Sequence, residues 1–151
     1  MIATQSIAEQ LSEIYFKEED WHPFKISYED AIKYHTKLYN QGNIQIYEIG
    51  GTVLGYFEVW YINFEQFGRL VAHAPFNQMD EDVISGKLAY VANTWIHPEH
   101  RKGVVYKILR NRFFKMSNKC DYYCGTALRK KTQPIKVFQV NKLKGELNGT
   151  A

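Results

Sequence analysis

A basic turn between two regular segments is the part of this chain whose residue types and spacing most clearly suggest a binding chemistry. The turn begins at His97, and its basic residues end directly before Gly103, where a helical pattern starts. The first turn of a helix has unpaired N–H groups and the positive end of the helix dipole, so it attracts anions. We therefore predict a phosphate site formed by Arg101, Lys102, Gly103, Val104 and Val105.

The segments on both sides of the turn favour that interpretation. A β-like run, Ala89–Ile96, comes before it, and apolar residues at helical spacing follow it from Val105 to Met116. The alternative is a solvated basic turn before an amphipathic helix, since basic turns that contain glycine occur widely.

Histidines flank the same turn. Imidazole side chains can accept protons near neutral pH, so His97 or His100 could act as a base or could simply support the loop. A metal site made by His73, His97 and His100 is conceivable, but the spacing fixes no carboxylate or further ligand. We predict no metal.

Length and composition indicate one soluble domain. The chain of 151 residues is 45% hydrophobic and 23% charged, as in an ordinary globular protein with a single core. No apolar run approaches the roughly 20 residues of a membrane span, and the N-terminus lacks the basic start of a signal peptide. We expect a cytoplasmic protein without membrane association, in which Cys120 and Cys124 are buried free thiols.

The charge is distributed unevenly. Residues 1–96 contain 6 Lys or Arg and 13 Asp or Glu, whereas residues 97–151 contain 13 and 3. A basic second half suggests a polyanionic partner, which could be a phosphorylated cofactor, a nucleic acid or the acidic half of the same chain.

Helix signals mark the N-terminal part. Serine followed three residues later by an acidic residue indicates helix starts at Ser6 and Ser27. The first helix should extend to about residue 17 and the second over about Tyr28–Asn40, with Gly42 as its stop.

Strand signals follow. Two runs, Ile44–Ile49 and Thr52–Ile62, are separated by a Gly-Gly pair that predicts a hairpin, and Gly55 predicts a bulge or a close backbone approach. The stretch Asn63–Gly86 is expected to be a loop with one short helix.

The C-terminal part should add a strand over Cys120–Leu128 and a helix over Ile135–Leu143. Helices then come before, between and after the strands. This order predicts an α/β (α+β) fold with three layers, α-β-α, around a central mixed sheet.

The order of elements and the turn together resemble the GCN5-related N-acetyltransferase (GNAT) superfamily. The resemblance is carried by the segment Trp95–Gly103, with the sequence WIHPEHRKG, followed by Leu109, and it covers roughly Gln45–Leu128. It implies one GNAT-like domain over 1–151, with N-terminal helices in 1–42, a cofactor-binding core in 43–128 and a basic C-terminal segment in 129–151. It also implies a C-terminally truncated fold, because the chain ends before the family's usual final β-hairpin.

The resemblance also implies roles for particular residues. In this family the turn holds the pyrophosphate of coenzyme A, and the splayed end of the preceding strand pairs with the pantetheine arm. Acetyl-CoA (coenzyme A) is then the expected cofactor, and Trp95 and Ile96 join the phosphate-site residues in binding it. Asn93 and Thr94, near the splay point, would line the substrate side of the site, although surface positions fit them equally well.

Proton transfer is assigned through the same resemblance. Glu58, in the long strand, would accept the amine proton through water, with His97 as a second candidate. A glutamate flanked by apolar residues in a half-exposed strand can instead face solvent.

Some positions depart from the family pattern. The turn is spaced differently after Arg101, and Val105 stands where a small residue is usual. The position aligned with the family's general-acid tyrosine, in the expected last helix, is Phe138, which has no proton to give. We therefore expect slow turnover.

The resulting prediction is an N-acyltransferase that moves an acetyl group from acetyl-CoA to an amine of a small molecule or a protein. Two alternatives remain open: an inactive GNAT-fold binding module, and a small basic protein associated with nucleic acid. An open sheet edge would also be compatible with a homodimer.

Overall fold

A five-stranded mixed sheet forms the centre of the computed structural model, which describes residues 5–17, 26–72, 74–130 and 133–142. The strands lie in the sheet in chain order: β1 (Ile44–Ile49), β2 (Thr52–Ile62), β3 (Leu88–Ile96), β4 (Tyr122–Lys130) and β5 (Gln133–Lys142). Neighbouring strands are antiparallel except for β3 and β4, which are parallel. The predicted mixed sheet is confirmed.

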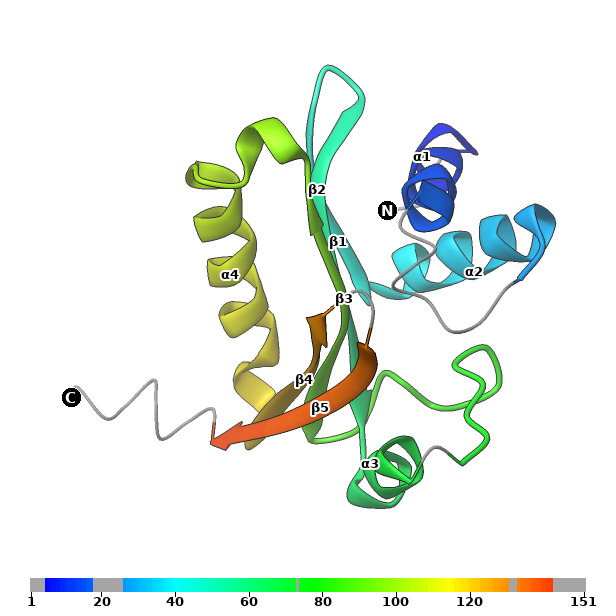
Figure 1. Ribbon diagram of the computed structural model, residues 1–151, viewed down its shortest axis with the longest axis vertical. Coiled ribbons are helices and arrows are strands. Elements are labelled where there is room, and N and C mark those ends of the chain that lie inside the picture. The colour runs from blue at the N-terminus through cyan, green and yellow to red at the C-terminus, as the bar shows by residue number, and fades with distance from the viewer. Residues whose placement is uncertain (1–4, 18–25, 73, 131–132, 143–151) are drawn as a thin grey trace.

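Helices cover both faces of this sheet, which confirms the predicted three layers. The first two helices, α1 (Gln5–Lys17) and α2 (Tyr28–Gln41), lie on one face, and α4 (Val104–Met116) lies on the other (Figure 1). The short helix α3 (Phe64–Val71) follows β2, and the 3-10 turns η2 (Pro98–His100) and η3 (Ser117–Lys119) flank α4. No helix in the described ranges combines the length and apolar character needed to cross a bilayer.

The helix signal at Ser27 and the hairpin signal are confirmed, whereas α1 already includes Gln5, so Ser6 lies inside the helix and does not cap it. Ser27 caps α2, because its hydroxyl accepts a hydrogen bond from the Asp30 N–H at 3.1 Å, and Gly42 ends the helix with a φ of 87°. Gly50 and Gly51 have φ values of 59° and 83°, as a tight two-residue hairpin turn between β1 and β2 requires.

Gly55 allows α4 to pack closely on the sheet, which confirms the predicted close approach. A Cβ at this position would lie 2.9 Å from Val105 Cγ1 and 3.1 Å from Leu109 Cδ1. Gly55 is paired with Ile96, the last residue of β3, so this contact fixes the first turns of α4 beside the end of that strand.

The last element is a strand, and the predicted helix over Ile135–Leu143 is wrong. Instead, β5 covers Gln133–Lys142 and pairs antiparallel with β4. The segment is rich in β-branched residues, which favour strands, and the otherwise unpaired edge of β4 offers a full ladder of hydrogen bonds. The strand predicted over Cys120–Leu128 is present as β4, which begins at Tyr122.

Two apolar cores lie on opposite faces of β2. Alternate side chains of the strand point to opposite sides, so Tyr56 and Trp60 pack toward α1 and α2, whereas Phe57, Val59 and Tyr61 pack toward α4. Both cysteines are buried free thiols, as predicted.

Candidate active site

The strand β3 separates from its parallel neighbour halfway along its length. Residues Leu88–Val91 pair with Tyr122–Gly125 of β4, and the parallel pairing ends there. At the same point β3 is bulged against β2, since Glu58 pairs with Asn93 but the next residue, Val59, pairs with Val91. In the described part of the sheet, residues 92–96 therefore present an unpaired edge toward β4, at the predicted splay point.

Glu58 is buried beside this splay point. Its exposed fraction is 2%, so the solvent-facing alternative is wrong. The Tyr34 hydroxyl of α2 donates to Oε2, and Trp60 Nε1 donates to the same oxygen at 2.6 Å. Burial raises the pKa of Glu58 to about 7, although the hydrogen bonds from Tyr34 and Trp60 act in the opposite direction. A carboxyl group with this pKa can take up or release a proton near neutral pH.

The second oxygen of Glu58 remains available for chemistry. Both donors bind Oε2, and Oε1 has no hydrogen-bond partner among the described residues. This arrangement suits a base that accepts a proton through a water molecule.

The structure brings two of the predicted β3 residues to the face that carries Glu58. Asn93 lies directly opposite Glu58, and its amide Nδ2 donates to the Tyr56 hydroxyl at 2.9 Å. Trp95 packs against Tyr56 on the same face, with ring centroids 6.3 Å apart. Thr94 alternates to the opposite face and is exposed, so it does not join this group.

The basic turn and the N-terminus of α4 lie at the end of β3. Gly103 is the N-cap residue in extended conformation, and no side chain caps the helix. Arg101 and Lys102 are exposed, and Arg101 Nε donates to the carbonyl of Ile96, the last residue of β3, at 2.9 Å. Uncapped N–H groups beside two cations fit a phosphate group.

Space around the helix start also fits a ligand. A Cβ at Gly103 would meet only the His100 carbonyl oxygen, at 3.8 Å, so the fold itself does not require glycine there. Val105 is buried and its side chain points toward Gly55, which leaves only its N–H for a ligand. The branched side chain of Val105 therefore does not obstruct the approach of a phosphate, and the side chain of Val104 is exposed.

His97 and His100 support the turn. His97 Nδ1 accepts a hydrogen bond from the Glu99 N–H at 3.2 Å, and the two histidine rings touch with centroids 5.7 Å apart. Because the Nδ1 lone pair is engaged, Glu58 is a better candidate for a base than His97. His97, Glu99 and His100 place ligand atoms within 4.8 Å of one another, but that hydrogen bond would have to break for Nδ1 to bind a metal. His73 lies outside the described residues.

The residue that was aligned with the family's general-acid tyrosine lies on a strand. Phe138 belongs to β5 and pairs with Thr126 of β4, so its alignment with a helical tyrosine is wrong.

Sequence reasoning also missed the contacts that Tyr34 and Trp60 make with Glu58. The spacing of Glu58 and Trp60 on one strand face could have indicated Trp60, whereas no local signal links Tyr34 to a residue 24 positions away.

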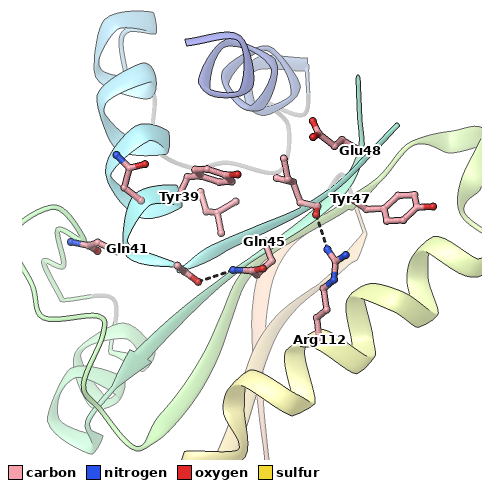
Figure 2. A pocket seen from close by; sticks show the side chains of 10 residues that line it. Tyr39, Gln41, Gln45, Tyr47, Glu48 and Arg112 are labelled. Carbon is pink, nitrogen blue, oxygen red and sulfur yellow. Dashed lines mark hydrogen bonds between the residues drawn. The ribbon is translucent and has the colours of Figure 1, made fainter. Parts of the chain in front are cut away.

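A hollow of about 570 Å³ along the outer edge of β1 lies apart from these residues (Figure 2). It is lined by the C-terminal end of α2, by β1 and by Arg112 of α4, and it contains none of the predicted site residues. Arg112 crosses this hollow and donates to the Ile46 carbonyl at 2.8 Å, which covers part of the sheet edge.

Comparison with known proteins agrees with the predicted fold. No family model and no curated protein matches the chain, but solved structures do. A ribosomal-protein-alanine N-acetyltransferase from Brucella melitensis is 14% identical, with a TM-score of 0.54 over 83% of this chain and 72% of that one. Diaminobutyrate acetyltransferase EctA from Paenibacillus lautus, solved with its substrate and coenzyme A, is 10% identical, with a TM-score of 0.55 over 87% and 66%.

A GNAT-family acetyltransferase from Streptococcus pneumoniae is also 10% identical, with a TM-score of 0.52 over 85% of this chain and 74% of that one. Identities this low establish the fold and leave the activity to be argued from the site. The chain has the GNAT fold, in a form whose sequence has diverged far from these proteins.

Proposed function

We propose that this protein is an N-acyltransferase that moves an acetyl group from acetyl-CoA to an amine of a small molecule or a protein. One observation carries the proposal. The buried carboxyl group of Glu58, with a pKa of about 7, lies at the point where β3 separates from β4, and the uncapped N-terminus of α4 follows the open edge of the same strand.

The acyl donor would lie along β3 and the turn. The N–H groups at Gly103, Val104 and Val105, together with Arg101 and Lys102, would hold its phosphates. The open backbone edge near Trp95 and Ile96 would pair with the pantetheine amides, and an N–H of that edge would polarise the thioester carbonyl. The donor's contribution is an acetyl group activated as a thioester.

Asn93 and Glu58 would handle the acceptor. Asn93 would orient the amine from its position opposite Glu58. Glu58 would take the amine proton through water as the nitrogen attacks the thioester carbon and the carbon–sulfur bond breaks. The thiolate would take its proton from solvent, since no acid has been identified for it.

A cytoplasmic location and a homodimer remain predictions.

Thiol release in the presence of a panel of amines tests the proposal. Glu58→Gln should lower turnover by about 10²- to 10⁴-fold, the usual contribution of a general base, and wild-type turnover should rise as the pH passes about 7. Glu48→Gln, which changes an exposed carboxylate on the neighbouring strand, is the matched control and should leave turnover unchanged. Acetyl-CoA binding without thiol release for any amine would favour the inactive binding module instead.

A further inference from the structure

The outer side of α4 and its flanking turns form a surface of one charge. Residues 100–120 contain seven Lys or Arg and no Asp or Glu, and all seven cationic side chains are exposed. Arg101 and Lys102 belong to the proposed acyl-donor site, and we call the surface formed by the other five cations the cationic face; its members are Lys107, Arg110, Arg112, Lys115 and Lys119. In the described structure α4 lies alone on its side of the sheet, away from α1 and α2 (Figure 1).

The acidic half of the chain does not neutralise this face. Within the described ranges, the salt bridges connect Arg69 of α3 with Glu65 and Glu81. Lys107 and Lys115 make no ion pair there. Asp82 lies near enough to Lys119 for the lysine charge to help lower the pKa of Asp82. The cations along α4 itself take part in none of the salt bridges of the described ranges, so they are left to a partner.

Several of the cations are held in place before any partner arrives. The Arg110 guanidinium lies 5.2 Å from the centre of the Phe114 ring, and Arg112 is held by the Ile46 carbonyl. Lys119 donates to the Ile84 carbonyl at 2.9 Å and lies over the Tyr61 ring. Side chains that are already ordered lose less entropy on binding.

The chemistry of the face favours a string of phosphates. At about 1.5 Å per residue, Lys107 and Lys115 are roughly 12 Å apart along the axis of α4, enough to follow neighbouring phosphates. Exposed amides of Asn111 and Asn118 lie among the cations, and such side chains commonly bind phosphate and sugar oxygens. Large exposed apolar side chains on α4 are confined to its first turn, at Val104 and Tyr106. The rest of the helix therefore offers few apolar side chains to which a membrane or an apolar protein surface could bind.

We propose that the cationic face binds the sugar–phosphate backbone of nucleic acid, separately from the acyl-donor site. Fluorescence anisotropy with a labelled DNA duplex and a labelled single-stranded RNA, between about 50 and 200 mM salt, measures this. The logarithm of the affinity should fall linearly with the logarithm of the salt concentration. Tighter binding to one probe would show which form of the backbone fits.

Two double variants make the test specific. Lys107→Glu with Lys115→Glu should weaken binding by about tenfold or more and reduce the salt slope by about two. Lys17→Glu with Lys33→Glu, which makes the same charge change at exposed positions of α1 and α2, should bind as wild type does. Thermal melts confirm that both variants are folded.

Three outcomes would overturn the proposal. Equal weakening by both double variants would show attraction by net charge alone. Binding to vesicles of anionic lipid but to neither nucleic acid would assign the face to a membrane surface. No salt-dependent binding to either probe would leave the face without this role, whatever the result for acetyl-CoA.

Discussion

Each face of β2 packs against an apolar core, and one of the two faces also buries a carboxyl group. Toward α4, Phe57, Val59 and Tyr61 join an apolar core. Toward α1 and α2, Glu58 lies between aromatic residues, bonded to Tyr34 and Trp60. Burial of a carboxyl group opposes stability, and groups with pKa values shifted this way are concentrated at functional sites. Both faces of the strand therefore stabilise the fold through apolar packing, and the face toward α1 and α2 also carries the candidate chemistry at a cost in stability.

The largest effect is expected on the apolar face. Phe113 of α4 is buried, and its ring contacts those of Phe57 and Tyr123 with centroids 6.0 Å away in each case. Phe113→Ala should lower the free energy of unfolding by about 3–5 kcal/mol. Urea unfolding should give the same loss at pH 5 and at pH 8, because no titrating group is involved. A loss confined to one pH would contradict the separation of the two faces.

A somewhat smaller effect, which depends on pH, is expected on the other face. Burial raises the pKa of Glu58 to about 7 from its ordinary value of 4.5, so the unfolded chain gives up this proton at lower pH than the folded one. The contribution of Glu58 to the free energy of unfolding should then be largest below about pH 4.5 and should fall by about 3 kcal/mol as the pH rises from there to above 7.

Glu58→Gln isolates that contribution. The difference in unfolding free energy between wild type and Glu58→Gln should change by this amount between pH 4 and pH 8, since the amide does not titrate. A difference that stays constant over this range would mean that the pKa of Glu58 is not raised.

A pair of tyrosine variants gives the smallest effect and the finest comparison. Tyr34 lowers the pKa of Glu58 through its hydrogen bond, so Tyr34→Phe should raise that pKa and move the pH profile of turnover to higher pH. Tyr61, on the opposite face, has its hydroxyl 3.3 Å from Ser117 Oγ. Each variant should cost about 1 kcal/mol of stability, but Tyr61→Phe should leave the pH profile unchanged. If both variants shifted the pH profile of turnover, the shift in Tyr34→Phe would not result from the lost hydrogen bond to Glu58.

Much of the fold could be predicted because its signals are local. The helix start at Ser27, the helix stop at Gly42 and the hairpin between Ile44–Ile49 and Thr52–Ile62 each depend on a few adjacent residues. The turn from Arg101 to Gly103 was recognisable for the same reason.

The remaining features depend on contacts between distant residues. The strand β5 forms because β4 offers it an edge, and the burial of Glu58 results from the packing of α2 over β2. The hydrogen bond from Tyr34 to Glu58 likewise joins two elements whose relation no sequence period reveals. Local patterns therefore indicated the basic turn as a candidate phosphate site but left the surroundings of the carboxyl group undetermined.

The account centres on an acyl-donor site at the end of β3, and a thermal melt with acetyl-CoA tests it most directly. A ligand present at 100 times its dissociation constant should add about 2.7 kcal/mol of stability. Gly103→Glu would place a carboxylate among the N–H groups meant for phosphate, and it should abolish the shift in midpoint. Gly68→Glu is the matched control, because a Cβ at that exposed position of α3 meets nothing within 4 Å.

We expect acetyl-CoA to raise the midpoint of wild type and of Gly68→Glu and to leave Gly103→Glu unchanged. No rise for wild type at any concentration, or an equal rise for all three proteins, would contradict the site.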